Sequence, residues 1–315
     1  MKAAVIGAGH MGRLHAQKLA ALEGVQLVGI ADPDGARAKE VASQTKSSPY
    51  GRYEELFGKA EAVVIAAPTD RHAEIARACL ERGLHVLIEK PIAQSLREAD
   101  ELIALSKEKR TVLQVGHVER YNRAFAPLAA RMDRPLFIES ERLSAFKKRG
   151  AEVDVVLDLM IHDIDLALAL ARAPLTDVSA CGFRVLTGDI DIANARLEFA
   201  NGCVASLSAS RVSQAAVRKL RVFQPDLYVS ADLQVAKLRF VRRADGVIEQ
   251  STSAIHEWEE SHAGGDALAA QAQAFVAAIR ERRPVPVDGE AGRLALQVAL
   301  DVGRRVRERL ERFAK

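Results

Sequence analysis

The stretch AAVIGAGHMG, residues 3–12, decides the fold of this 315-residue chain. A strand-like apolar run leads directly into a glycine turn, and apolar residues at helical spacing follow from about Met11 to Leu22. Glycines here permit a tight turn, close approach of the backbone to a pyrophosphate, and close helix packing. Free amides at the helix start favour negative charge. The pattern predicts dinucleotide contacts at Gly7, Gly9, His10, Met11 and Gly12, and a glycine turn without a ligand is the alternative.

Asp32 ends the next strand-like run, about twenty residues beyond the glycine turn. A carboxylate at this position accepts hydrogen bonds from the adenosine ribose hydroxyls and repels a 2′-phosphate, so we expect NAD in preference to NADP. Arg37 and Lys39 are close in sequence and can moderate that preference.

Working outward, short apolar runs alternate with helical stretches through the first third of the chain. This alternation is typical of βαβ units with a parallel sheet and right-handed crossovers. The expected strands are 3–6, 26–30, 62–66, 85–88 and 112–115, and the expected helices are 11–22, 35–44, 72–82 and 95–107.

After about Asn122 the pattern changes to long alternating runs, which predict an antiparallel sheet with one covered face. We expect a strand at 136–143, a helix at 153–171, alternating runs at 193–207 and 220–238, and closing helices at 267–282 and 290–313. The predicted fold class is α/β, with a dinucleotide-binding domain at 1–121 and a second α/β domain at 122–315.

Composition excludes several classes of protein. Lys and Arg number 45 against 42 Asp and Glu, so nothing demands nucleic acid. The three cysteines lie far apart in apolar contexts, which suits reduced thiols and neither a disulfide framework nor a zinc site. No apolar run approaches ~20 residues and no signal core is visible. We therefore expect a cytoplasmic protein without a membrane segment or a metal.

Two further loops follow predicted inner strands, at the sheet edge where ligands bind in open α/β folds. Ala67, Pro68 and Thr69 place small and polar groups there, and His72 opens a helix. These four residues are predicted cofactor contacts, whereas helix capping by Thr69 and simple capping or surface use of His72 are the alternatives.

The tripeptide Glu89-Lys90-Pro91 ends the fourth predicted strand. Lys90 projects toward the expected position of the cationic nicotinamide ring. Like charge and partial burial disfavour the ammonium form, so this lysine can accept or relay a proton. Glu89 can offset that effect by pairing. A solvated surface lysine is the alternative.

Asp158 and His162 are one helical turn apart and share a largely apolar face. Buried Asp and His are costly unless paired, so we expect mutual hydrogen bonding or a ligand. A structural pair, a metal pair and a catalytic pair remain open, although no further ligand cluster supports a metal.

The glycine loop, Glu89-Lys90-Pro91 and Asp158-xxx-His162, in this order, resemble the glucose-fructose oxidoreductase and inositol dehydrogenase family. The resemblance covers nearly the whole chain. It implies a Rossmann domain followed by an α/β domain with a large open sheet that often supports homodimers or homotetramers. It also implies catalytic roles for Lys90, Asp158 and His162, in which Lys90 or His162 takes the alcohol proton and Asp158 orients the histidine.

The chain departs from many members of that family in its catalytic helix. The lead Glu152-Val153-Asp154 replaces a glycine-rich segment, and Met160 replaces a glycine. Residues 116–122 and 158–165 resemble instead the branch that oxidises the C3 hydroxyl of UDP-N-acetylglucosamine for lipid A. Another nucleotide sugar, a free sugar, inositol, or a non-enzymatic NAD-responsive regulator are the alternatives.

A nucleotide sugar carries a diphosphate, which needs cations or backbone amides. After the fifth predicted strand, arginine can bind anions and asparagine can hydrogen-bond to sugar hydroxyls. Lys147 begins a run of basic residues, for which a solvated charge cluster is the alternative. The predicted contacts to this small-molecule substrate are His117, Arg120, Tyr121, Asn122, Arg142 and Lys147.

Overall fold

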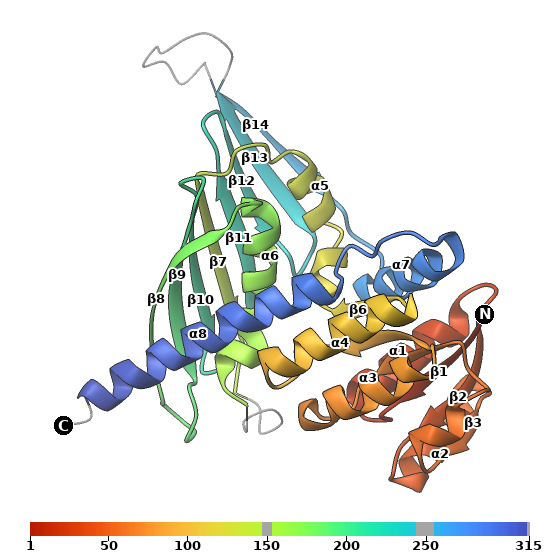
Figure 1. Ribbon diagram of the computed structural model, residues 1–315. Coiled ribbons are helices and arrows are strands. Elements are labelled where there is room, and N and C mark those ends of the chain that lie inside the picture. Colours follow the sequence, from red (N-terminus) through yellow and green to blue (C-terminus); the bar gives the residue numbers. More distant parts are fainter. Residues whose placement is uncertain (147–152, 244–254, 314–315) are drawn as a thin grey trace. The chain divides into compact units, whose positions relative to one another are not determined.

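A computed structural model describes residues 1–146, 153–243 and 255–313 (Figure 1). By packing, the chain divides into two compact units. The first unit comprises Met1–Val118 and Asp266–Leu296, and the second comprises the chain from Glu119 to Gly265 and from Gln297 onward. Residues 266–296, which were predicted to belong to the second domain, therefore pack with the first.

In the described residues, the first unit contains a six-stranded parallel sheet of order β3-β2-β1-β4-β5-β6. This order is that of a Rossmann fold, which confirms the predicted fold class. The strands are β1 Lys2–Ile6, β2 Gln26–Ala31, β3 Ser48–Tyr50, β4 Ala62–Ile65, β5 His85–Glu89 and β6 Leu113–Gly116.

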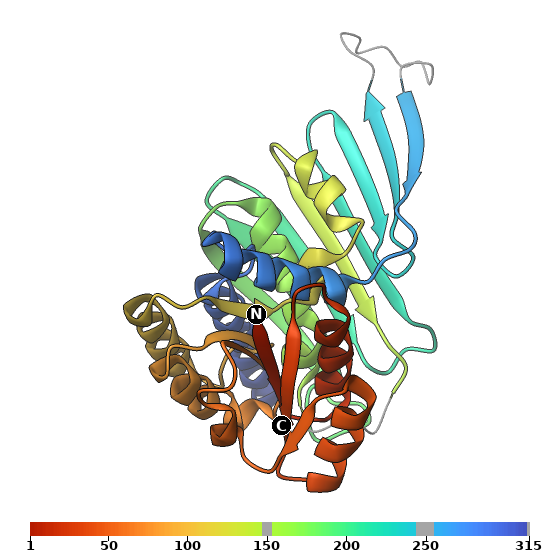
Figure 2. The ribbon, with the colours of Figure 1, turned by 90° about the vertical axis from the view of Figure 1, so that its right-hand side faces the viewer.

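Helices cover both faces of this sheet, as Figure 2 shows. The helices α1 and α2 contact β2, and α3 contacts β4 and β5 on the other side. Because β4 and β6 are buried along their whole length, they appear in the sequence as continuous apolar runs. The helices are α1 His10–Ala21, α2 Gly35–Thr45, α3 His72–Glu81, α4 Leu96–Lys109 and α7 Ala267–Glu281.

Helix α7 joins the first unit through apolar packing. Ala272 and Phe275 of α7 are buried in the same cluster as Leu19 of α1, and α7 contacts α1 directly. The side chain of Lys18 also pairs with Asp266, at 2.6 Å. These contacts explain why a segment distant in sequence belongs to the nucleotide-binding unit.

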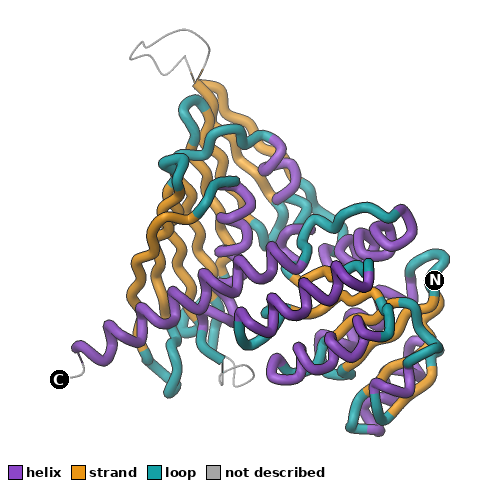
Figure 3. The backbone as a smooth tube through the Cα atoms, viewed as in Figure 1, coloured by secondary structure: helices purple, strands orange, loops and turns teal. Residues whose placement is uncertain are grey.

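The second unit contains, in the described residues, an eight-stranded sheet of order β14-β13-β12-β11-β7-β10-β9-β8 (Figure 3). One pair, β7 and β10, is parallel, and the other pairs are antiparallel. The strands are β7 Phe137–Leu143, β8 Leu175–Phe183, β9 Ile192–Phe199, β10 Val204–Ser210, β11 Val217–Phe223, β12 Leu227–Asp232, β13 Lys237–Arg243 and β14 Ile255–Ser261.

Buried and less buried residues alternate along β7, β9, β10 and β12, so one face of this sheet is covered. The predicted helix at 153–171 begins as a π-helical turn, η4, at Val156–Met160 and continues as α6 at Ile161–Ala171. Both contact the sheet through β10, and α5 (Phe125–Ala130) contacts β12. The last helix, α8, runs from Gly289 to Phe313.

None of the helices in the described ranges is long and apolar enough to cross a membrane.

Asp191 organises the loop between β8 and β9. Its carboxylate accepts hydrogen bonds from the backbone amides of Val185, Leu186 and Thr187 at 2.7–2.9 Å. The Thr187 hydroxyl donates a further bond. Burial alone would raise the pKa of Asp191, but these four donors lower it to about 2, from an ordinary 3.8.

Asp191→Asn should therefore lower the free energy of unfolding by roughly 1–2 kcal/mol at pH 7. The native carboxylate has the lower pKa, so its contribution is present above 3.8 and is lost as the pH falls toward about 2. Urea unfolding at several pH values should show the two proteins converging on acidification. The exposed neighbour Asp189→Asn is the control, and an equal effect of both changes would contradict this role.

Candidate functional site

The glycine turn leaves room for a ligand at one glycine and for nothing at the other two. Gly7 has φ +94°, and a Cβ there would lie 2.6 Å from the Ala66 carbonyl oxygen. A Cβ on Gly12 would overlap the carbonyl of Gly7. A Cβ on Gly9 would meet no protein atom within 4 Å. Gly7 and Gly12 serve the fold, whereas Gly9 keeps open the space that a pyrophosphate needs.

Asp32 lies directly after β2 and is nearly buried. Its carboxylate accepts hydrogen bonds from the backbone amides of Ala8, at 2.7 Å, and Asp34, at 2.9 Å. Because Ala8 belongs to the glycine turn, this carboxylate ties the end of β2 to the turn.

A cavity of about 560 Å³ opens at the carboxyl ends of β1, β2 and β4, a volume typical of small-molecule sites. Its lining includes Gly7, Asp32, Ala67 and Pro68, which were predicted cofactor contacts. The other lining residues are Ile6, Ala31, Pro33, Asp34, Arg37, Gly51, Arg52, Tyr53, Glu54, Arg71 and Ile75. The open space at Gly9 and this cavity fit a dinucleotide.

His72 has a structural role that differs from the predicted one. Its side chain is buried, with Nδ1 2.8 Å from the Pro91 carbonyl oxygen and Nε2 2.9 Å from that of Ala67. Both ring nitrogens therefore face carbonyls of the loops that follow β4 and β5, and because burial lowers the pKa of His72, the neutral imidazole donates to one of the two. Thr69 begins a short 3₁₀ turn, and the capping position of α3 is Arg71, so Thr69 does not cap that helix.

Glu89 and Lys90 lie at the end of β5, as predicted. The Glu89 carboxylate is buried and lies 2.6 Å from Nε2 of His15, which is itself fully buried on α1. Burial alone would raise the pKa of Glu89, but the hydrogen bond and charge of His15, with the charge of Lys90, bring it below the ordinary value. His15 was missed in the sequence, although it lies three residues beyond Gly12.

Asp158 lies in the π-helical turn and His162 in the first turn of α6. Both side chains are half-buried, whereas their neighbours Met160 and Ile161 are fully buried. In η4 the Ile161 amide donates to the Val156 carbonyl five residues back. Such wide turns occur frequently at functional sites.

Asp154 caps the helix that carries Asp158. Its carboxylate accepts hydrogen bonds from the amides of Val156 and Leu157, both at 3.0 Å, and pairs with Arg307 at 3.1 Å. In the segment before this helix, where the resemblance implies a glycine-rich sequence in many family members, this chain therefore has a charged capping residue. Met160, at the other departure, fills the core.

Most of the predicted substrate arginines and amides belong to an internal network of the second unit. Arg142 is buried and donates to Asp163, at 2.7 Å, and to Glu119, at 2.9 Å. Asn122 donates to Glu119 at 3.0 Å and to the Leu233 carbonyl at 2.8 Å. The substrate-binding roles predicted for Arg142 and Asn122 are therefore replaced by structural ones, because carboxylates and a carbonyl occupy their donors.

The other four predicted substrate contacts differ in their surroundings. Arg120 donates to Asp165 through Nε, at 2.7 Å, and Nη2, at 2.9 Å. Burial raises the pKa of Tyr121, and its hydroxyl has no hydrogen-bond partner in the described part of the chain. His117 is buried beside β6 in the first unit. Lys147 lies outside the described residues.

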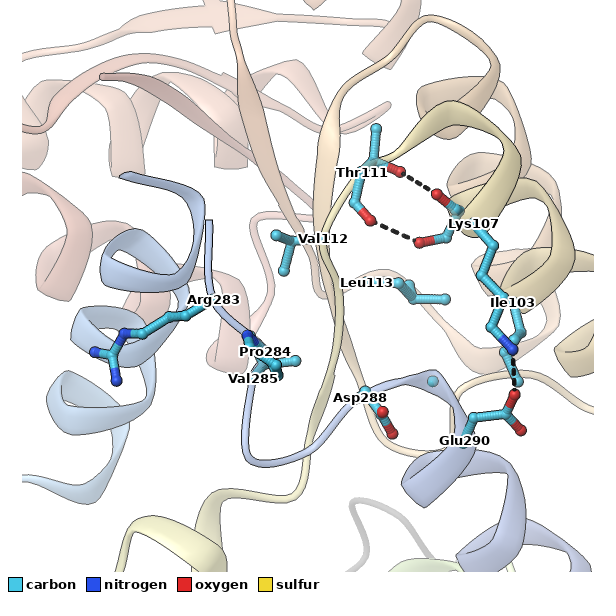
Figure 4. Close-up of a pocket in the computed structure, with 12 residues that line it drawn as sticks. Ile103, Lys107, Thr111, Val112, Leu113, Arg283, Pro284, Val285, Asp288 and Glu290 are labelled. Carbon is cyan, nitrogen blue, oxygen red and sulfur yellow. Dashed lines mark hydrogen bonds and ion pairs between the residues drawn. The ribbon is translucent and has the colours of Figure 1, made fainter. Parts of the chain in front are cut away.

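A second cavity of about 240 Å³ lies at the opposite, amino end of β6 (Figure 4). Its charged groups are satisfied by protein: Lys107 pairs with Glu290 at 2.7 Å, and Asp288 caps α8 through the Ala291 amide. Arg283 pairs with Glu281. Because ligands of open α/β sheets bind at the carboxyl ends of strands, the larger cavity is the cofactor candidate.

Within the ranges that the structure describes, no group of three or more His, Cys, Asp and Glu side chains could hold a metal ion.

Comparisons with known proteins agree with this geometry. Residues 1–117 match the model described as oxidoreductase family, NAD-binding Rossmann fold, and residues 128–225 match the GFO/IDH/MocA C-terminal domain. The chain is 40% identical over 303 residues to the UDP-N-acetylglucosamine 3-dehydrogenase of Acidithiobacillus ferrooxidans, with 96% of each chain covered. A solved structure of such an enzyme from that organism has a TM-score of 0.93 at 39% identity and covers 99% of both chains.

A more distant relative is the scyllo-inositol 2-dehydrogenase (NAD(+)) of Bacillus subtilis, which is 30% identical over 236 residues, with 68% of each chain covered. The fold, the open glycine turn and these matches define an oxidoreductase with NAD as its cofactor. The chain belongs to the GFO/IDH/MocA oxidoreductase family, as its motifs predicted.

The second and third glycines of the turn, Gly9 and Gly12, allow a test that separates folding from binding. Gly9→Ala should change the free energy of unfolding by less than about 1 kcal/mol without cofactor, yet weaken NAD binding at least tenfold, because the new Cβ enters the ligand's space. Gly12→Ala should destabilise the cofactor-free protein by roughly 2 kcal/mol or more, because it overpacks the turn. Urea unfolding and calorimetric NAD titration measure both; loss of stability in Gly9→Ala would contradict the assignment.

Removal of His15 should lower the free energy of unfolding, because the buried Glu89 carboxylate loses its partner. His15→Leu leaves the carboxylate without its imidazole, so we expect a loss of about 3 kcal/mol in the free energy of unfolding. Adding Glu89→Gln should recover part of that loss. The matched control is His10→Leu on the same helix, whose side chain is exposed and whose change should cost little. Equal losses at His10 and His15 would refute the pairing role.

Proposed function

We propose that this oxidoreductase oxidises a sugar hydroxyl of a nucleotide sugar, at C3 of UDP-N-acetylglucosamine, to the keto sugar. The observation that carries this proposal is the 40% identity, across 96% of both chains, to an enzyme named for that reaction. The motifs at 116–122 and 158–165, which resemble this branch, support the same substrate.

The reaction divides into a hydride and a proton. NAD, when bound, accepts the hydride that leaves the carbon bearing the hydroxyl. The chain's own residues must hold the cofactor and take the hydroxyl proton. We propose that the open space at Gly9 receives the pyrophosphate and that Asp32 accepts hydrogen bonds from the adenosine ribose. Asp32 lines the 560 Å³ cavity, as does Gly7 of the same glycine turn.

For the proton, we propose Lys90 or His162 as the acceptor and Asp158 as the group that orients the histidine. Three features support these roles. Lys90 follows a buried Glu89 whose charge is balanced by His15. Asp158 sits in a π-helical turn with a charged cap, Asp154. Neither Asp158 nor His162 is fully buried.

For the substrate, we retain His117, Arg120, Tyr121 and Lys147 as proposed contacts. Arg120 uses two donor atoms on Asp165, and its Nη1 is not part of that pair. The Tyr121 hydroxyl is a polar atom without a partner in the described residues. Arg142 and Asn122 are omitted because their donors serve the internal network.

The second candidate substrate is inositol or a free sugar, which the similarity to a scyllo-inositol dehydrogenase favours. A purely regulatory role receives no support, because the relatives from Acidithiobacillus ferrooxidans and Bacillus subtilis are both named dehydrogenases. We also propose that the protein takes part in making the amino sugar of lipid A. We further propose that it forms a homodimer or homotetramer and that it is cytoplasmic.

The substrate is tested by the absorbance of reduced cofactor with purified protein, NAD and UDP-N-acetylglucosamine, with a trap for the keto product. A UDP-uronic acid, glucose and scyllo-inositol are run in parallel. Reduction with UDP-N-acetylglucosamine alone supports the proposal. Reduction with inositol or glucose alone would move the chain to the second candidate.

The catalytic roles are tested by Lys90→Ala and His162→Ala, each of which should lower turnover by ~10²-fold or more while NAD affinity stays near that of the unchanged protein. Lys107→Ala and His256→Ala are matched controls, because Lys107 and His256 are exposed and far from these motifs in sequence. Full turnover in both test variants would remove the proposed mechanism.

A further inference from the structure

The lining of the cofactor cavity includes two carboxylates besides Asp32, those of Asp34 and Glu54. Asp34 lines the same cavity, as does Arg37, whereas Lys39 does not. Of the two cations that sequence placed near Asp32, only Arg37 can therefore reach a group bound there.

Asp34 holds Arg37 through backbone and side chain together. One carboxylate oxygen caps α2 by accepting from the amides of Ala36 and Arg37, both at 3.1 Å. The other oxygen accepts from the Arg37 guanidinium at 3.0 Å. These contacts with Arg37 lower the pKa of Asp34, so the carboxylate is charged at neutral pH.

The other arginines of the cavity are also neutralised. Arg52 pairs with Glu54 at 3.3 Å, and Arg71 pairs with Glu74 at 2.9 Å. Asp32 is the cavity carboxylate whose described hydrogen bonds come from backbone amides, those of Ala8 and Asp34. Each of the three lining arginines is thus paired with a carboxylate other than Asp32.

A 2′-phosphate carries about −1.5 to −2 charge at neutral pH and is recognised best by a guanidinium. The Asp32 and Asp34 carboxylates oppose such a group here, and Asp34 also engages the Arg37 guanidinium. We propose that Asp34 is a second determinant of cofactor choice, which excludes NADP by adding negative charge and by engaging Arg37, a latent binding residue for the 2′-phosphate.

This inference rests on the proposed function for its cofactor alone. Its test is therefore equilibrium binding and not turnover, so a wrong sugar substrate would leave it intact. Failure of the unchanged protein to bind NAD would instead count against the cofactor assignment itself.

The experiment measures calorimetric affinities for NAD and NADP in four proteins: unchanged, Asp34→Ser, Asp32→Ser, and the double variant. Serine is chosen at Asp34 because it also caps helices. Asp34→Ser alone should strengthen NADP binding roughly five- to tenfold while NAD binding changes less than about threefold. Asp32→Ser alone should weaken NAD and leave NADP weak. The double variant should bind NADP more tightly than NAD.

The role of Arg37 is tested in the double variant. Arg37→Gln should abolish the gain in NADP affinity, whereas the matched change Arg52→Gln, at another arginine of the cavity, should not. Thermal unfolding of each variant shows that folding is retained. The proposal is overturned if Asp34→Ser leaves NADP affinity unchanged, if Asp32→Ser alone gives tight NADP binding, or if Arg37→Gln and Arg52→Gln have the same effect.

Discussion

The placement of α1 against the sheet is the constraint on which the cofactor site depends. A Cβ on Gly12 would overlap the Gly7 carbonyl, so α1 can pack this closely against the turn only with a glycine at this position. Two side-chain contacts then take their position from this helix and its turn. The Ala8 amide receives the carboxylate of Asp32, and His15 receives that of Glu89. The Asp32 carboxylate and the Lys90 loop are thus aligned on one element.

Paired charge is the second common feature, and it has a different purpose in each unit. In the first unit, His15 allows Glu89 to remain buried beside Lys90, and the cavity arginines are matched to nearby carboxylates. In the second unit, Arg142 joins Glu119 to Asp163 within the covered side of the sheet. Breaking a buried pair of this kind costs several kcal/mol, so these residues are poorly suited to release a partner for a substrate.

The sequence predicted most strands and helices because their apolar period is strong. The buried strands β4 and β5 and the helices α3 and α4 lie within a few residues of the predicted ranges. The strands β3, β8 and β14 were missed. β3 has three residues, and β8 and β14 are the largely exposed edge strands of the second sheet, so none shows the alternation of a half-buried strand. The π-helical turn at Asp158 was read as ordinary helix because hydrogen-bond register leaves no mark in the pattern.

The sequence by itself determined the alternation of strands and helices in the first unit, the glycine turn, Asp32 and the family, because each depends on residues that are neighbours along the chain or recur at a fixed period. Only the tertiary structure decided which charged and polar side chains are free to bind a ligand. His72 is committed to two carbonyls, Arg142 to two carboxylates, and Glu89 to His15, 74 residues away. The physical reason is that a hydrogen bond or ion pair depends on distance in space, and chain folding sets that distance independently of separation in sequence.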